Sequence, residues 1–189
     1  MTRGRLEAFS DGVIAILITI MVLELRIPHG DSLATLRSVL SAFLYYTLSF
    51  VYLGIYWTNH HHLLHTVSTV NGRILWANLH LLFWLSLVSV MTAWTGENHL
   101  ALVPTVTYGV VLIFAAVAYT ILVMTIIATH GPQSKLASAI GRDIKGKLSI
   151  VLYGIGILAA FVDPRISATM YVLVAVIWFV PDRRIERSV

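Results

Sequence analysis

Two polar stretches interrupt the apolar segments of this sequence and hold the groups that could do chemistry. Ser10 and Asp11 lie near the start of the first apolar segment, and a histidine-rich stretch follows the second. A carboxylate or hydroxyl inside an apolar helix is costly without a partner, so these positions indicate a site or a structural network. The residues expected to form this buried network are Arg5, Ser10, Asp11, Trp57, His61 and Asn78. The alternative is that each finds a separate local partner.

Two other kinds of chemistry can be drawn from the same residues. Ser10, Asp11 and His61 could assemble a membrane-embedded hydrolase, because a nucleophile needs a neighbouring base. His61 and His65 have the i, i+4 spacing at which two imidazoles can share one metal ion. No glutamate stands between them in a zinc-protease pattern, and no acidic ligand is expected near them. We therefore expect no metal site and no cofactor.

The composition limits what can position these groups. Hydrophobic types make up 58% of the 189 residues and charged types 12%, with a mean hydropathy of +0.83. A soluble domain has about a quarter of its residues charged, so a soluble enzyme and a disordered chain are both excluded. The sequence has no cysteine, which excludes disulfides, thiolate metal sites and cysteine nucleophiles.

Six apolar segments suggest membrane-spanning helices, although the fifth and sixth are short for full spans. They cover about residues 6–27, 39–58, 74–93, 102–128, 148–162 and 166–180. Breaks such as Pro28, Gly131-Pro132 and Asp163-Pro164 separate them, and no two-residue alternation favours strands. The sequence predicts an all-α integral membrane protein with one six-helix domain over residues 1–189.

The basic residues predict the orientation in the membrane. With six spans, ten of the 13 Lys and Arg residues fall on the side that holds both termini. Positive charge accumulates on cytoplasmic loops, so both termini are expected in the cytoplasm and the protein in the cell (inner or plasma) membrane. The net charge of +4 then reflects topology and contact with lipid headgroups, and not nucleic-acid binding.

One apolar stripe runs along the first segment at helical spacing. Its members are Ile16, Thr19, Ile20 and Leu23. Asp11 lies about 140° from the centre of this stripe at 100° per residue. The stripe could pack on neighbouring helices of the same chain. Alternatively, copies from several subunits could surround an axis, where a ring of Ile or Leu forms a hydrophobic constriction.

The first segment also resembles a known family. Arg5, Phe9, Ser10 and Asp11 reproduce the R-x-x-x-F-S-D signature of a potassium-channel family that comprises bacterial six-helix channels and the endolysosomal potassium channel of animals. The stretch from Tyr56-Trp57 to His60-His61, followed by Asn78, is similar as well. The resemblance covers essentially the whole chain.

The resemblance implies a potassium-permeable cation channel without the T-V-G-Y-G carbonyl filter, which this sequence lacks. First helices of the family line the pore around the symmetry axis, and Ile16 matches the main constriction. Thr19, Ile20 and Leu23 match further pore positions. The animal channel resembles two such units in one chain working as a dimer, so a homotetramer is expected here. An enzyme is not expected, and potassium is the permeant ion.

The signature residues are implied to support the pore helix from behind. The helical wheel instead puts Arg5 and Phe9 close to the Ile16 stripe, and the two interpretations conflict at these positions. The alternative functions are a secondary transporter, or the hydrolase built on Ser10, Asp11 and His61. A transporter is expected to show inverted repeats and a carboxylate near the membrane midplane.

Overall fold

The regular structure of this chain is helical wherever it is described. The computed structural model describes residues 1–25, 28–140 and 143–179. Within those residues the helices are α1 (Arg3–Leu23), α2 (Leu33–His65), α3 (Gly72–Glu97), α4 (Leu102–His130), α5 (Lys135–Ile140), α6 (Ile144–Ala159) and α7 (Pro164–Phe179). The expected all-α class is confirmed for the described residues.

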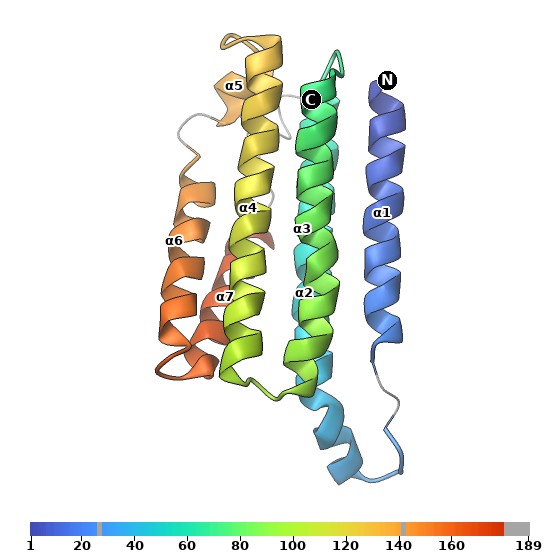
Figure 1. The fold of residues 1–189 in the computed structure, drawn as a ribbon, viewed down its shortest axis with the longest axis vertical. Coiled ribbons are helices and arrows are strands. Elements are labelled where there is room, and N and C mark those ends of the chain that lie inside the picture. The colour runs from blue at the N-terminus through green and yellow to red at the C-terminus, as the bar shows by residue number, and fades with distance from the viewer. Residues whose placement is uncertain (26–27, 141–142, 180–189) are drawn as a thin grey trace.

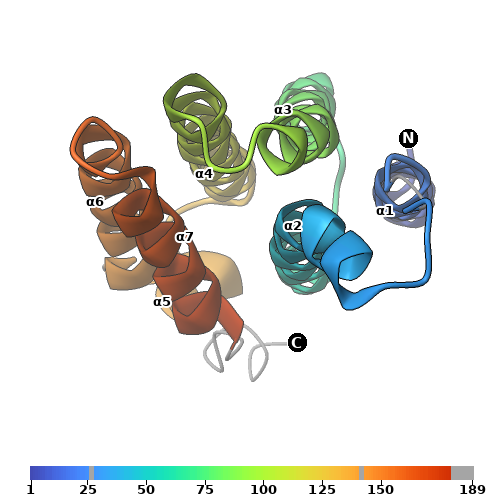
Figure 2. The ribbon, with the colours of Figure 1, turned by 90° about the horizontal axis from the view of Figure 1, so that it is seen from below.

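The long helices form one bundle in which successive members alternate in direction. In Figure 1, α1, α3 and α6 run downward, and α2, α4 and α7 run upward. Viewed along the bundle in Figure 2, α1 stands at one edge beside α2 and α3, while α6 and α7 form the opposite edge. Helix α1 therefore packs against its own chain on one side only.

Side chains that satisfy free backbone groups mark several helix ends. Ser32, Asn71 and Asp143 precede α2, α3 and α6, and each accepts a hydrogen bond from the backbone N–H three residues on, at 3.2, 2.9 and 3.1 Å. Such N-caps partner N–H groups that the helix itself leaves free. Gly131 ends α4 with a φ of +92°, and Pro164 begins α7. These ends agree with the breaks expected at Gly131-Pro132 and Asp163-Pro164.

The helix bounds differ from the expected apolar segments where polar residues continue a helix. The second segment was expected to end at Thr58, but α2 continues through the histidines to His65. Apolarity marks only the part of a helix suited to lipid, whereas the backbone hydrogen bonds continue through polar residues. The first segment was expected to reach Ile27, but α1 ends at Leu23. The positions of Ile27 and Val180 themselves lie outside the described residues.

Among the residues that the structure describes, four helices have the length and composition to cross a membrane. They are α1, α2, α3 and α4, with mean hydropathies of 2.1, 1.6, 1.8 and 2.8 in their most apolar windows. Helix α7 is a shorter apolar helix. Helices α6 and α7 have 16 residues each, which at 1.5 Å per residue gives a length of about 24 Å.

A core rich in tyrosine joins α2, α4, α6 and α7. Tyr52, Tyr108, Tyr153 and Tyr171 are buried with their rings in mutual contact. The hydroxyl of Tyr108 lies 2.8 Å from the Ser49 hydroxyl, and the hydroxyl of Tyr171 donates to the Thr105 carbonyl oxygen at 3.2 Å. These bonds partner polar groups that would otherwise be costly in an apolar interior.

Candidate functional site

Helix α1 has one buried face and one open face. Its buried residues are Leu6, Ser10, Ile14, Leu17 and Met21, which recur every three or four positions. On the opposite face Ile16, Ile20 and Leu23 are 59%, 43% and 77% exposed. Thr19 is exposed on the same side, and its hydroxyl donates to the Ala15 carbonyl oxygen at 2.8 Å. The four residues expected to line a pore thus lie on the face that this chain leaves uncovered.

A chain of buried hydrogen bonds holds α1 against α3 and α2. The Asn78 carboxamide accepts at Oδ1 from His60 Nε2 at 2.6 Å and donates from Nδ2 to Ser10 Oγ at 2.9 Å. Ser10 in turn donates to the Leu6 carbonyl oxygen at 2.9 Å. A carboxamide oxygen only accepts, so the proton of His60 sits on Nε2. His60 Nδ1 is buried and has no hydrogen-bond partner among the described residues.

A second set of polar contacts joins α1 to α2 at one-turn intervals. Arg3, Glu7 and Asp11 are four residues apart on α1, as are Trp57, His61 and His65 on α2. The Arg3 guanidinium donates to the His65 carbonyl oxygen at 3.3 Å, and Glu7 Oε1 lies 2.8 Å from His61 Nδ1. Trp57 Nε1 donates to Asp11 Oδ1 at 3.0 Å. Equal spacing on two antiparallel helices brings each pair together, and we call these contacts the polar ladder.

The structure brings together some of the expected network and leaves other members apart. Ser10 and Asn78 meet, and Asp11 meets Trp57. Arg5 is exposed and Phe9 is 49% exposed, on the same open side as Ile16. The helical wheel describes these two positions correctly, and the family-based expectation that they support the helix from behind does not. Arg5 and Phe9 are 11 and 7 residues from Ile16, close to whole numbers of helical turns, so all three lie on the same side of α1.

The cluster expected for a hydrolase is not assembled. Ser10 bonds to Asn78 and its own helix, Asp11 bonds to Trp57, and His61 contacts Glu7. Each member of the expected serine, carboxylate and histidine set therefore has a different partner. The expectation that no acidic ligand lies near the histidines is wrong, because Glu7 approaches them from another helix.

Sequence reasoning missed Glu7, Arg3 and the role of His60. A signal for the first two was present, since the four-residue repeat of Arg3, Glu7 and Asp11 matches that of Trp57, His61 and His65. No such signal singles out His60 over its neighbours. The rotation of α2 about its axis decides which histidine meets Asn78, and packing sets that rotation.

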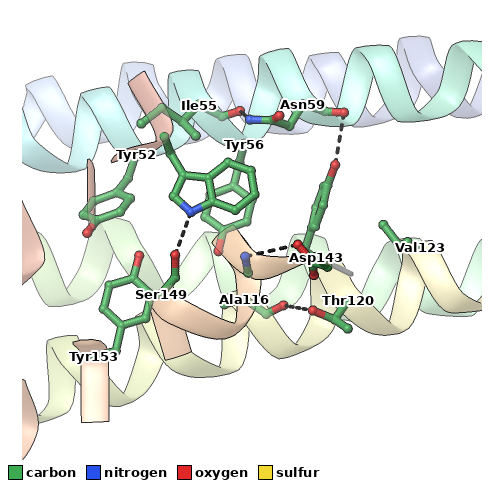
Figure 3. Close-up of a pocket in the computed structure, with 13 residues that line it drawn as sticks. Tyr52, Ile55, Tyr56, Asn59, Ala116, Thr120, Val123, Asp143, Ser149 and Tyr153 are labelled. Carbon is green, nitrogen blue, oxygen red and sulfur yellow. Dashed lines mark hydrogen bonds between the residues drawn. The ribbon is translucent and has the colours of Figure 1, made fainter. Parts of the chain in front are cut away.

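A separate pocket lies between α2, α4, α6 and α7 (Figure 3). Several of its polar groups are paired: Trp178 Nε1 donates to Ser149 Oγ at 2.7 Å, and the Gly146 N–H donates to Asp143 Oδ1 at 3.1 Å. The remaining lining is mostly aromatic and aliphatic, including Tyr52. A mostly apolar lining offers few ligands to an ion, so this pocket is a poor candidate for an ion path.

The fold and the two-faced α1 define a class of protein. The described helices include four that are long and apolar enough to cross a membrane, and the polar contacts lie between helices. Such a chain is an α-helical integral membrane protein.

Comparison with known proteins gives the family. A family model described as the endosomal/lysosomal potassium channel TMEM175 matches residues 5–88. A potassium channel of Chryseobacterium sp. is 57% identical over 188 residues, covering 100% of this chain and 98% of the relative. A potassium channel of Streptomyces collinus is 30% identical over 183 residues, covering 91% of this chain and 89% of the relative.

A solved structure agrees with these relatives. The crystal structure of a lysosomal potassium-selective channel TMEM175 homolog from Chamaesiphon minutus matches with a TM-score of 0.83 at 25% sequence identity, covering 95% of this chain and 97% of that one. The chain belongs to the TMEM175 potassium channel family. The resemblance drawn from the signature is thereby confirmed, and the family and these relatives are potassium channels, not enzymes.

Proposed function

We propose that this protein is a potassium-permeable cation channel whose pore is lined by the open face of α1. The observation that carries the proposal is the exposure of Ile16, Ile20 and Leu23 on the side of α1 that turns away from its own bundle. A ring of such side chains forms a constriction that ions cross only by losing water. This hydrophobic constriction takes the place of a carbonyl filter.

The proposed assembly is a homotetramer in the cell membrane. One α1 at the edge of a bundle cannot enclose a path, whereas copies around an axis can, so the pore requires cyclic symmetry. The edge position of α1 in Figure 2 supports this arrangement, since no other described helix lies outside it. The relatives' designation as potassium channels supports potassium as the permeant ion.

The proposed orientation has both termini in the cytoplasm. Helices α1, α3 and α6 begin at one end of the bundle (Figure 1). The basic residues at or near these starts are Arg3, Arg5, Arg73, Lys145 and Lys147. Only Arg37 and Arg165 accompany the starts of α2 and α7 at the other end. This asymmetry supports a cytoplasmic location for the first end. Lys135 is the first residue of α5, which lies at the same end as the start of α1 (Figure 1). The remaining bases used for the orientation lie outside the described residues: Arg26, Arg142, Arg183, Arg184 and Arg187.

A channel accounts for the polar residues better than the two alternatives do. Ser10, Asp11 and His61 have separate partners and so lack the shared geometry of a hydrolase. Asp11 lies in the N-terminal half of α1 and bonds to Trp57, whereas a transporter is expected to have a carboxylate near the membrane midplane. The buried hydrogen bonds of Ser10 and the polar ladder are both explained if they hold α1 in place and leave its apolar face free.

The direct test of this function is electrical. Purified protein in planar bilayers of neutral lipid, with potassium chloride as the only solute, should carry a current that follows the potassium gradient. The proposed constriction needs neither nucleotide nor a second solute gradient. Absence of current from protein that elutes as an intact oligomer, or dependence of transport on a coupled solute, would contradict the proposal. Empty bilayers and heat-denatured protein are the controls.

A further inference from the structure

Three side chains with metal-ligating atoms converge where the start of α1 meets the end of α2. Glu7 offers a carboxylate oxygen, and His61 and His65 each offer a ring nitrogen. These three atoms all lie within 4.8 Å of one another. Glu7 Oε1 is 2.8 Å from His61 Nδ1 and 3.5 Å from His65 Nε2. The channel function described above uses the contact between Glu7 and His61 only to hold α1 in place, and it needs no metal ion there.

The spacing fits a small divalent ion. Zinc binds histidine nitrogen and carboxylate oxygen at about 2.0–2.1 Å, so two ligand atoms of a tetrahedral site lie about 3.3 Å apart. The two distances from Glu7 Oε1 lie on either side of that value. His61 and His65 are one helical turn apart on α2, and their ring centres are 4.4 Å apart. Only small side-chain movements are needed to direct all three atoms at one ion.

The chemistry of the donors selects the kind of ion. Two imidazoles with one carboxylate suit zinc and similar transition metals, whereas magnesium and calcium prefer sets made of oxygen alone. The side chains of Glu7, His61 and His65 are 15%, 42% and 30% exposed. An ion can therefore reach the cluster, and a water molecule can take a fourth position.

We propose that Glu7, His61 and His65 form a site for a divalent transition metal of the zinc type, which fastens α1 to α2. The ion would replace the direct contact between Glu7 and His61 with bonds from both helices to one centre. The ion would thereby strengthen the middle contact of the polar ladder, the one between Glu7 and His61. Binding of the metal does not depend on the proposed channel function, because it requires only that α1 and α2 pack as described.

The proposal is tested by titrating Zn²⁺ into detergent-solubilised protein prepared without a polyhistidine tag, using isothermal titration calorimetry. One Zn²⁺ per chain should bind. Glu7→Gln, His61→Ala and His65→Ala should each weaken binding at least about tenfold, as loss of even indirect support for a metal ligand does. His99→Ala is the matched control, because His99 is an exposed histidine in the connection between α3 and α4, and it should bind like the parent.

A second measurement separates the site from general loss of folding. Zn²⁺ should raise the thermal unfolding midpoint of the parent and of His99→Ala, since a ligand that binds only the folded state stabilises it. Zn²⁺ should leave the thermal unfolding midpoint of Glu7→Gln unchanged. Co²⁺ should give the visible absorption of a four-coordinate ion in the parent but not in Glu7→Gln. Equal Zn²⁺ affinity in the parent and all three ligand variants, or no Zn²⁺ binding to the folded parent, would overturn the proposal.

Discussion

Ser10 on α1 and Asn78 on α3 are joined by a hydrogen bond of 2.9 Å between two side chains with no solvent exposure. The bond continues through Asn78 to His60 on α2, so three helices share one buried polar chain. Ser10 lies on the opposite side of α1 from Ile16. The contact that holds α1 to its bundle therefore also sets the rotation that leaves Ile16 uncovered.

Replacement of Asn78 tests this chain. Asn78→Leu keeps a similar volume but leaves Ser10 Oγ and His60 Nε2 without their partner. A buried polar group that loses its partner costs about 1–3 kcal/mol, and we expect the free energy of unfolding to fall by about that amount. The thermal midpoint in detergent, followed by tryptophan fluorescence, measures the change. Asn98→Ala is the control, since its bond to the Trp94 carbonyl oxygen is exposed and its loss should cost little. Equal midpoints for the two variants would contradict a structural role for Asn78.

Asp11 is expected to support assembly and not ion selection. Asp11→Ala removes the acceptor for Trp57 Nε1, so the yield of intact oligomer in light scattering coupled to size exclusion should fall. Asp11→Asn keeps an acceptor oxygen at the same place, now in a carboxamide, and should recover most of that yield. The reversal potential with potassium on one side and sodium on the other should be the same for both variants and the parent. A changed reversal potential with normal assembly would instead put Asp11 in the ion path.

Gly109 on α4 tests the packing that seats α7. A methyl group on Gly109 would run into the hydroxyl and ring of Tyr171, and into Ile157. Gly109→Ala should therefore destabilise the protein by about 1–3 kcal/mol, the usual cost of overpacking, despite the better helix propensity of alanine. Gly154→Ala on α6 is the matched control, because nothing lies within 4 Å of its added carbon, and it should be neutral or slightly stabilising. Comparable thermal midpoints for the two variants would mean that α4 and α7 are not packed this closely.

A polar side chain at Ile16 should weaken the proposed constriction. Ile16→Asn offers oxygen and nitrogen atoms to ions that have lost water, so the dehydration barrier falls. We expect higher single-channel conductance and a smaller preference for potassium over sodium. Ile16→Leu keeps an apolar ring and should resemble the parent in both. If both variants behave like the parent, the constriction lies elsewhere.

The sequence predicted the parts of the molecule that local physics determines. The apolar segments follow from composition. The helix end at Gly131 follows because glycine adopts positive φ angles readily, and the helix start at Pro164 follows because proline has no N–H to lose. The spacing of Ile16, Ile20 and Leu23 placed these residues on one stripe of α1, but it left open whether that stripe packs within the chain or stays uncovered. The signature around Ser10 predicted the family, which the comparisons confirm.

The pairing of polar residues could not be predicted in the same way. His61 was expected beside Ser10, Asp11 and Asn78, yet His60 meets Asn78 and His61 meets Glu7. Neighbouring residues on a helix point about 100° apart, so the choice between them depends on how α2 is rotated against α1 and α3. That rotation results from packing along the whole of α2, including its buried Tyr45 and Leu53, and no short motif encodes it.

The central claim is that Ile16 faces the ion path, and a cysteine at this position tests it most directly. The parent has no cysteine, so Ile16→Cys introduces a single thiol. A charged methanethiosulfonate reagent added to channels in a planar bilayer should reduce the potassium current of Ile16→Cys. The same reagent should leave the parent and Met124→Cys unaffected, since Met124 is 63% exposed on α4, away from α1. An unmodified current in Ile16→Cys, under conditions in which a denatured sample reacts fully, would contradict the account.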